Sequence, residues 1–390
     1  MPEGHRTMSD APFTVIFAAG GTGGHIFPAL AVAEELRSMH PSVETVFLAS
    51  EREIDAQILR TARVSWSPIP ARPFIPRPGP LVSLALHWGG AVRASRRAIR
   101  ESSRVLALVT TGGFVAAPAA RAARIHRIPT VLINLDAVPG RANTLLATHA
   151  TRKLTTADAP EVPADWMRIP PIVRAHARSS ASPQSARLGF GLDPDSPTVL
   201  ITGGSQGARS INEFILAMLR DAADAFRGWQ VIHQCGASTG STRTDHVLQT
   251  AYDATGIPAS VLPFIDRMND AWAAADFAIA RAGAGNVAEV WANAVPTLFL
   301  PYPFHADNHQ ERNARVLTSV GAAILATDEI DAAKNLASVG PVVREVLASS
   351  DRRAEMSAAL ARLGPADGAT RAARVVADLI APTFGARRTR

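Results

Sequence analysis

Short apolar runs alternate with glycine-rich loops and helical patterns along the first half of the chain. Such runs have the length and composition of buried parallel strands. The predicted strands of this half cover residues 13–19, 44–49, 105–110 and 129–135. A helical pattern from Phe27 to about Met39, with Pro28 in its first turn, connects the first two strands. This alternation predicts a parallel sheet covered by helices.

The same plan restarts in the second half of the chain. Its predicted strands cover residues 197–202, 276–280 and 296–300. After the first of them, apolar residues recur three and four positions apart from Ile211 to Ala222, which gives a helix with one apolar face. A further helix is expected to open at Val287. The second half therefore predicts a second sheet of the same kind.

The segment between the halves, residues 158–185, is rich in proline, and Ser179 to Pro183 has the composition of a surface linker. We expect an α/β protein with two doubly wound, Rossmann-like domains at residues 11–178 and 179–368. Residues 369–390 are expected to form a C-terminal helix and basic tail that return to the first domain. Sheets of this kind bind ligands at the carboxyl ends of their strands, so we expect a site in a cleft between the two domains.

Three glycine-rich loops each lie between a predicted strand and a predicted helix, at residues 20–25, 203–207 and 283–286. Small residues let backbone N–H groups approach an anion, and the helix end adds partial positive charge. Glycines that serve only tight turns would explain one such loop more easily than three. The first loop lacks the ending of a nucleoside-triphosphate loop, and Ile26 stands where a dinucleotide fingerprint has its third glycine. Glu51 keeps a nicotinamide cofactor open as a weaker alternative.

The second loop also fits the nucleophile elbow of an α/β-hydrolase, with Ser205 as the nucleophile. Asp266 or Asp307, together with His305 or His309, would complete the order of a catalytic triad. A hydrolase has no need of a second doubly wound domain with its own phosphate-type loop, so this interpretation is the weaker one. Replacing Ser205 with alanine would abolish a hydrolase but only weaken a phosphate-binding protein.

Polar residues beside these loops are candidates for contacts with a ligand. Glu289, in the helix after the third loop, could accept two hydrogen bonds from a ribose diol, although an acid near a helix N-terminus is also favoured by the helix dipole alone. His25 closes the first loop and is a general-base candidate, because the pKa of histidine lies near working pH. Residues 301–314 combine polar side chains that suit a sugar better than a metal. They are His305, Asp307, His309, Gln310 and Asn313.

Composition narrows the class of function. Apolar residues make up 47% of the 390 residues, enough for two buried sheets. The net charge of +6 favours anionic partners, but no basic motif with interleaved aromatic residues predicts nucleic-acid binding. The single cysteine, Cys235, is expected to be a buried apolar residue. We expect no signal peptide, and no run approaches the roughly 18–20 apolar residues of a membrane span.

Several sequence blocks closely resemble glycosyltransferase family 28, the lipid I N-acetylglucosaminyltransferases of peptidoglycan synthesis. They occur in the family's order and spacing across about residues 13–330. The blocks are GGTGGHIFPALAVAEEL (20–36), TGGFVAAP (111–118), AVPGRAN (137–143), GGSQGARSIN (203–212), and the stretch from Phe264 through RAGAGNVAE (281–289) to HADNHQERNA (305–314). The resemblance implies a two-domain GT-B fold.

The resemblance also implies a reaction. N-acetylglucosamine would pass from UDP-N-acetylglucosamine to the C4 hydroxyl of the muramyl sugar on the undecaprenyl-diphosphate-linked muramyl-pentapeptide, lipid I, to give lipid II. The transfer would invert the anomeric centre and need no metal or other cofactor. Such an enzyme serves cell-wall synthesis and cell division.

The family's functional positions transfer to this chain one residue at a time. Thr22, Gly23 and Gly24 match donor contacts, and His25 matches the acceptor-side base. Arg174 matches an arginine near the nucleotide-sugar, Ser205 a diphosphate contact, Ile265 a residue facing the uracil, Glu289 the ribose-binding acid, and Gln310 a contact to the sugar hydroxyls.

The chain departs from the family pattern at a few of these positions. A usual His-Glu-Gln-Asn before AVPG is replaced by Ile133-Asn134-Leu135-Asp136. Asp136 could accept a sugar hydroxyl, or act as a base beside His25. Asn286 and Ala288 replace a threonine and a serine, and His309 replaces a glutamine in the substrate region. The departures leave open another lipid acceptor, or a paralogue that binds a UDP-sugar without turnover.

A lipid-linked acceptor requires a membrane surface. Residues 72–100 mix apolar and basic side chains, which suits peripheral attachment to an anionic leaflet as well as an ordinary amphipathic helix. The apolar members are Phe74, Ile75, Leu81, Leu84 and Trp88, and the basic ones are Arg72, Arg77, Arg93, Arg96, Arg97 and Arg100. With the family context, the expected location is the cytoplasmic face of the cell membrane.

Overall fold

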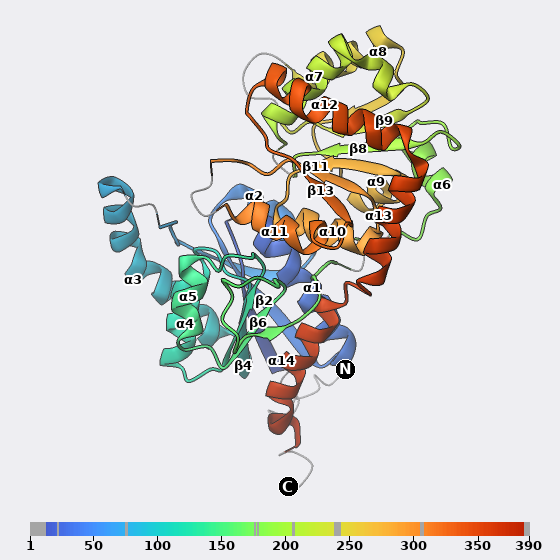
Figure 1. The fold of residues 1–390 in the computed structure, drawn as a ribbon. Coiled ribbons are helices and arrows are strands. Elements are labelled where there is room, and N and C mark those ends of the chain that lie inside the picture. The colour runs from blue at the N-terminus through green and yellow to red at the C-terminus, as the bar shows by residue number, and fades with distance from the viewer. Residues whose placement is uncertain are drawn as a thin grey trace, which may run out of the picture. The chain divides into compact units, whose positions relative to one another are not determined.

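The computed structural model describes residues 13–21, 23–74, 77–174, 177, 179–204, 207–237, 243–304 and 308–385. The chain forms two compact units. The first, the N-terminal unit, comprises residues 1–174 together with 367–390, and the second, the C-terminal unit, comprises residues 175–366. Each unit contains one parallel sheet and its own helices (Figure 1).

The N-terminal unit has a seven-stranded parallel sheet in the order β3-β2-β1-β4-β5-β6-β7. The strands are β1 Phe13–Ala18, β2 Val43–Ser50, β3 Ser65–Ile69, β4 Val105–Thr110, β5 Thr130–Asn134, β6 Arg152–Thr155 and β7 Met167–Arg168. The helices are α1 Gly23–Met39, α2 Glu53–Thr61, α3 Pro78–Glu101, α4 Ala116–Ile125, α5 Arg141–Ala147 and, from the end of the chain, α14 Gly368–Gly385. The order reverses at β1 and β4, as in other doubly wound sheets.

The centre of this sheet is held by apolar side chains on both faces. Every residue of β1 is buried, as its continuous apolar run predicted. Phe17 pairs in register with Phe47 of β2, and their rings stack with centroids 5.2 Å apart. Such a pair adds to the stabilisation that burial alone provides. The sheet therefore gives a rigid edge from which the loop after β1 leaves.

The C-terminal unit has a six-stranded parallel sheet in the order β10-β9-β8-β11-β12-β13. The strands are β8 Thr198–Thr202, β9 Gln230–Gln234, β10 Ala259–Leu262, β11 Phe277–Ala280, β12 Thr297–Phe299 and β13 Ala323–Leu325. The helices are α6 Pro183–Gly189, α7 Arg209–Asp221, a 3-10 helix Ala223–Phe226, α8 Thr244–Thr255, α9 Met268–Ala274, α10 Ala284–Asn293, α11 His309–Thr318, α12 Ala332–Ala348 and α13 Ser350–Arg362.

Alternate residues of β8 belong to different cores of this unit. Val199 and Ile201 pack with α7 and α12 on one face, whereas Leu200 packs with α9 and α10 on the other. Cys235 is buried in the first of these cores, as predicted, and burial raises the pKa of its thiol. The fold class predicted from the sequence, two doubly wound parallel sheets, is confirmed.

Some boundaries differ from those predicted. Helix α1 opens at Gly23 and α10 at Ala284, a turn or so earlier than the apolar patterns indicated, because glycine and alanine form their first turns. The segment expected to be a surface linker is part of the C-terminal unit. Its Ser179 donates a hydrogen bond to Asp270 at 2.7 Å, and Ser182 caps α6. The segment is largely exposed, as expected of surface chain, and it lies directly after the division between the two units.

The C-terminal helix α14 packs on α1 of the N-terminal unit. The N–H of Gly368 donates to the carbonyl of Pro171 at 3.1 Å, and Thr370 donates to Glu35 at 3.0 Å. Helix α14 therefore belongs to the N-terminal unit, although it follows the C-terminal unit in the sequence. In the part of the chain that the structure describes, no helix is both long and apolar enough to cross a membrane.

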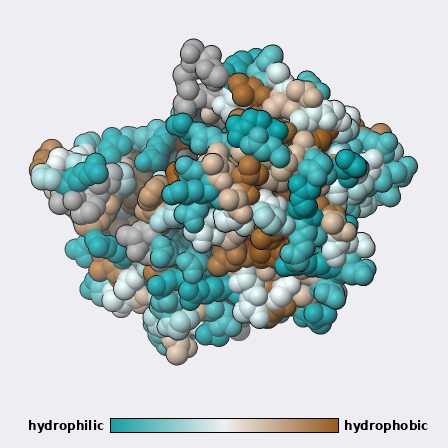
Figure 2. Space-filling model, turned by 45° about the horizontal axis from the view of Figure 1, so that its top comes forward, coloured by the Kyte–Doolittle hydropathy of each residue, from teal (hydrophilic) through white to brown (hydrophobic). Residues whose placement is uncertain are grey.

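Helix α3 is anchored along only half of its length. Its C-terminal half buries Ala91, Ala98 and Ile99, whereas no described side chain of residues 78–90 is buried. Figure 1 shows the N-terminal half of α3 extending away from the rest of its unit. In Figure 2 the end of this projection is coloured as hydrophobic. The exposed apolar side chains include Val82 at 59% and Leu86 at 76%. The exposed apolar side chains thus lie on the half of the helix that is not packed on the sheet.

Candidate active site

Gly21, in the loop after β1, is held from both sides by the start of α2. Its N–H donates to the carboxylate of Asp55 at 2.7 Å, and its carbonyl accepts from Arg52 at 2.8 Å. The loop turns at φ +98° there, and any Cβ would lie 2.4 Å from the ring of Phe114. Asp55 is fully buried and also accepts from the N–H and hydroxyl of Ser50. The Gly21 N–H is therefore already used and is not available to an anion.

His25 lies in the first turn of α1, beside the end of β4. Its Nδ1 is 3.0 Å from the carbonyl oxygen of Thr111, and the Thr111 hydroxyl donates back to the His25 carbonyl at 2.8 Å. A carbonyl only accepts, so Nδ1 carries the proton and Nε2 is left as the basic nitrogen of the neutral ring. The side chain is partly exposed. This orientation suits a general base for a ligand hydroxyl.

The end of β5 carries the departure from the family pattern. Ile133 and Asn134 are fully buried, and Leu135 is nearly so. The Asn134 amide donates to the Asp136 carbonyl at 2.7 Å and its oxygen accepts from Asn143 at 3.0 Å, so it fixes the loop that follows. Of the four substituted positions only Asp136 is partly exposed. Any effect on a ligand by direct contact therefore comes from Asp136.

The loop after β8 is closed by bonds of its own. Gly204 donates to the hydroxyl of Thr202 at 3.0 Å, and that hydroxyl donates to Gln234 at 2.6 Å. Gly207 donates to the Gly204 carbonyl at 2.8 Å. With φ of +71°, Gly207 lies so close to β9 that a Cβ would be 2.3 Å from the carbonyl oxygen of Cys235. These glycines serve a tight turn, and their N–H groups are already used.

The first turns of the helices that follow the glycine loops still offer N–H groups. Helices α7 and α10 have no side-chain cap and no acidic residue in the first turn, and α1 also lacks an early acid. Side chains of Ser182, Asp331 and Ser349 cap three other helices, whereas α3, α4 and α5 share the uncapped start without an early acid. Unpaired helix N-termini attract anions. An anion at these loops would therefore meet free N–H groups at the helix starts rather than those of Gly21, Gly204 and Gly207.

Glu289 lies on α10, in its second turn, and is partly buried. One carboxylate oxygen accepts a hydrogen bond from the indole N–H of Trp272 at 2.7 Å, and Trp272 itself is 1% exposed. Burial raises the pKa of Glu289 to about 6, against the opposing effect of the Trp272 bond. An acid that only complements a helix dipole would be exposed, so this carboxylate has the environment of a functional group.

Ile265 and Gln310 are candidate donor contacts on other loops of the C-terminal unit. The Ile265 side chain is 4% exposed and lies in the core. Only the backbone of Ile265 could therefore contact a nucleobase. Within the described residues, neither its N–H nor its carbonyl is hydrogen-bonded. Gln310, in the first turn of α11 beside His309, accepts at Oε1 from the Tyr302 N–H at 2.9 Å. Its amide N–H groups remain for a ligand.

Arg174 is part of the N-terminal unit. It forms an ion pair with Glu34 of α1 at 2.7 Å, and its Nε is buried without a hydrogen-bond partner. Other predicted positions lie outside the described residues, and they are Thr22, Ser205, His305 and Asp307. Gly23 and Gly24 open α1 directly before His25.

Sequence reasoning missed two residues that shape the site. From the sequence, Asp55 is an ordinary acidic residue in the first turn of a helix. Nothing in the sequence indicates that it contacts Gly21, 34 positions away. Trp272 reads as an apolar residue of a short helix. Both act through contacts between elements that are distant in sequence. Within the described residues, no three His, Cys, Asp or Glu side chains group as a metal site would require.

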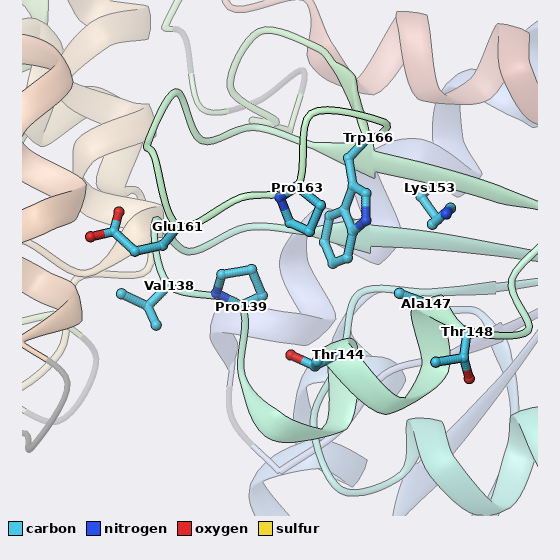
Figure 3. A pocket seen from close by; sticks show the side chains of 9 residues that line it. All are labelled: Val138, Pro139, Thr144, Ala147, Thr148, Lys153, Glu161, Pro163 and Trp166. Atoms are coloured by element: carbon cyan, nitrogen blue, oxygen red, sulfur yellow. The ribbon is translucent and has the colours of Figure 1, made fainter.

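A pocket of about 360 Å³ lies in the N-terminal unit (Figure 3). Its walls come from the loop before α5, from α5 itself and from the segment before β7. The lining residues are Val138, Pro139, Thr144, Ala147, Thr148, Lys153, Glu161, Pro163 and Trp166. None of the predicted catalytic or donor-binding residues lines it, so its size alone does not mark it as the active site.

Two family models match the chain. The glycosyltransferase family 28 N-terminal domain matches residues 15–155, and the C-terminal domain of the same family matches residues 198–372. Relatives from Nocardioides sp. and Streptomyces coelicolor are 38% and 35% identical, over 94% and 90% of this chain and 98% and 94% of their own lengths. Both are named UDP-N-acetylglucosamine--N-acetylmuramyl-(pentapeptide) pyrophosphoryl-undecaprenol N-acetylglucosamine transferase.

Solved structures agree with this assignment. MurG of Acinetobacter baumannii, at 25% identity, superposes with a TM-score of 0.68 over 94% of this chain and 99% of its own. A UDP-glucosyltransferase from Polygonum tinctorium, at 14% identity, has a TM-score of 0.67 over 95% and 98% of the two chains and supports the GT-B fold alone. The protein is a GT-B glycosyltransferase, and the chain belongs to glycosyltransferase family 28.

Proposed function

We propose that this protein transfers N-acetylglucosamine from UDP-N-acetylglucosamine to the 4-hydroxyl of the muramyl sugar of lipid I in peptidoglycan synthesis. The names of relatives that match nearly from end to end support the identity of donor and acceptor. The structure supports the roles of individual residues. The observation that carries the proposal is the orientation of His25, whose Nδ1 is bound to a carbonyl and whose Nε2 is the basic nitrogen.

The donor would be held by the C-terminal unit. The uncapped first turns of α7 and α10 would receive the diphosphate, with Ser205 as a further contact. Glu289 would accept hydrogen bonds from the ribose diol, and the backbone of Ile265 would meet the uracil edge. The free amide N–H groups of Gln310, with His309 beside it, would bind hydroxyls of the N-acetylglucosamine.

The reaction follows from this arrangement. The acceptor oxygen attacks the anomeric carbon on the face opposite the diphosphate, while His25 Nε2 takes its proton. The bond between the anomeric carbon and the diphosphate oxygen breaks, its electron pair stays on UDP, and the configuration inverts. Helix N-termini would stabilise the negative charge that develops on the leaving diphosphate, so the step would need no metal. Asp136 would accept a second acceptor hydroxyl and Arg174 would lie near the nucleotide-sugar, with Thr22, Gly23 and Gly24 close to the donor.

A direct assay tests the activity. Purified protein is incubated with UDP-N-acetylglucosamine and lipid I, and UDP release and lipid-linked disaccharide are measured together. His25→Ala should lower kcat by about 10²- to 10⁴-fold, the usual contribution of a general base, while UDP affinity is retained. His246→Ala, on the exposed surface of α8, is the matched control. UDP binding with no transfer to any lipid acceptor would identify a non-catalytic paralogue, and transfer only to another lipid would identify a glycolipid synthase.

We further propose that the exposed half of α3 attaches the protein to the cytoplasmic face of the cell membrane. Val82, Leu86 and Trp88 would enter the interface, with basic residues at the headgroups. Arg141, whose guanidinium lies 5.6 Å from the ring centroid of the exposed Phe74, is one of these. Each arginine near an anionic surface contributes about 1 kcal/mol.

Vesicle sedimentation tests this attachment. The protein should bind vesicles that contain phosphatidylglycerol more tightly than pure phosphatidylcholine vesicles, and salt should weaken the binding. The double variant Val82→Glu and Leu86→Glu should lose it, whereas Val247→Glu, at another exposed apolar position, on α8, should not. Binding that ignores both anionic lipid and the α3 substitutions would contradict the proposal.

A further inference from the structure

Arg281 and Asp328 form a buried ion pair at the carboxyl end of β11. Their side chains are 9% and 0% exposed, and Arg281 NH1 lies 2.7 Å from Asp328 Oδ2. Burial alone would raise the pKa of Asp328, but hydrogen bonds from Ser210, Asn335 and the Ile330 N–H, with the charge of Arg281, lower it overall. Buried pairs of this kind add little net stability, so stability does not explain why the pair stands at this end of the strand.

The remaining contacts of Arg281 reach three different segments. Its NH2 donates to the hydroxyl of Ser210, in the first turn of α7, at 2.7 Å. Its NH1 donates to the carbonyl of Leu300, directly after β12, at 2.7 Å. The guanidinium lies 5.7 Å from the ring centroid of Tyr302, and the Arg281 carbonyl accepts from Asn286, in the first turn of α10, at 2.9 Å.

The start of α7, the start of α10 and the loop after β12 are the segments proposed to bind the nucleotide-sugar donor. Ser210 belongs to the helix start that would receive the diphosphate, and Asn286 to the helix that carries Glu289. The Tyr302 N–H in turn donates to the side-chain oxygen Oε1 of Gln310, which leaves the Gln310 amide N–H groups for the sugar. A planar guanidinium offers five donors in a fixed fork, which an ammonium cannot reproduce.

We propose that Arg281 is a positioning residue for the nucleotide-sugar. Its guanidinium, charge-balanced by Asp328, holds the start of α7 and the loop after β12, and its backbone carbonyl holds the start of α10, so that diphosphate, ribose and sugar contacts are aligned before the donor arrives. This role rests on the proposed function and names the element that organises its donor site.

The other end of the same strand provides a matched comparison. Arg187 is as buried as Arg281, at 7% exposure for each residue. Its NH2 binds Asp276, directly before β11, at 2.8 Å, and it donates to the carbonyls of Ala274 and Pro194. This cluster has the same chemistry but lies at the amino ends of the strands, away from the glycine loops. The Asp276 side chain is 38% exposed, so this pair controls for loss of a buried arginine and its charge partner in the same unit.

Calorimetric binding of UDP and of UDP-N-acetylglucosamine tests the proposal. Arg281→Met with Asp328→Asn removes both charges, so no uncompensated buried charge prevents folding. This variant should bind both ligands weakly and lose roughly 10- to 100-fold in kcat/KM, as misplacement of contacting groups by about an ångström does. The loss should appear in the KM for the donor, with the KM for lipid I unchanged. Arg281→Lys with Asp328 retained should recover only part of the affinity.

The control pair is Arg187→Met with Asp276→Asn, which should bind both ligands like the wild type even if its unfolding temperature falls equally. Unchanged UDP and UDP-N-acetylglucosamine affinity in the Arg281 variant would overturn the assignment, as would an equal loss of affinity in the control. If the wild type itself binds neither ligand, the proposed function fails and the role of Arg281 falls with it.

Discussion

Glu289→Gln should make the protein more stable and a poorer binder of its donor. The substitution keeps the shape of the side chain and an oxygen that accepts from Trp272, and it removes only the ionised state. In the fold, burial raises the pKa of this carboxyl from 4.5 to about 6. A shift of this size corresponds to at most about 2 kcal/mol of cost for holding the charge. Glutamine avoids that cost.

The sign of the pH dependence follows from the same shift. The folded pKa lies above the unfolded one, so the folded protein binds more protons between pH 4.5 and 6. The wild type therefore gains stability as the pH falls through this window and loses it as the pH rises through about 6. At pH 8 the free energy of unfolding of the glutamine variant should exceed that of the wild type by about 1–2 kcal/mol. This corresponds to an unfolding temperature higher by roughly 2–8 °C for a unit of this size. Below pH 4.5 the difference should vanish.

Donor binding should change in the opposite direction. A hydrogen bond to a charged acceptor contributes about 1.5–3 kcal/mol, so UDP affinity at pH 8 should fall by roughly 10- to 150-fold. The assays are thermal unfolding between pH 4 and 8 and titration calorimetry with UDP. Glu345→Gln, on the exposed surface of α12, should change neither stability nor affinity appreciably. A glutamine variant that is less stable at pH 8, or that binds UDP like the wild type, would refute the reasoning.

Four further substitutions test other parts of the site. Trp272→Phe removes a hydrogen bond that lowers the pKa of Glu289, so the loss of UDP affinity on acidification should begin at a higher pH than in the wild type. Asp55→Ala leaves three buried donors without an acceptor and should lower the free energy of unfolding, measured in urea, by about 3 kcal/mol. Asp136→Asn should lower kcat/KM for lipid I by roughly tenfold through loss of a charged acceptor, with UDP affinity unchanged in calorimetry. Gly207→Ala places a Cβ 2.3 Å from a carbonyl oxygen, so unfolding and UDP titration should show a less stable and weaker-binding protein.

The fold could be predicted because its signals are local. A buried parallel strand is a short apolar run, and each of the strands predicted from such a run is present, β1 and β8 among them. The glycine loops were also visible as sequence, and with them the places where helices begin at the carboxyl ends of strands. The resemblance to family 28 depended on these same blocks.

The electrostatics of the site could not be predicted, because they depend on partners far apart in the chain. Asp55 takes the N–H of Gly21 across 34 positions, so the first glycine loop offers fewer donors than its composition suggests. Trp272 and Glu289 meet across two helices, and only their contact shows that the acid is not an exposed helix-end residue. Ile133 looked like a change in the site, yet β5 directs it into the core.

The return of α14 to α1 has a consequence for synthesis. The C-terminal unit is encoded as one uninterrupted block, so it can fold while the chain is still emerging from the ribosome. The N-terminal unit cannot be finished at that stage, because α14, which packs on α1, is translated after the whole C-terminal unit. The part that would receive the acceptor is thus completed after the part that would hold the donor. A gene fragment cut at residue 174 would lack a piece of its own unit, and a faithful separation of the halves requires α14 to be rejoined to the first of them.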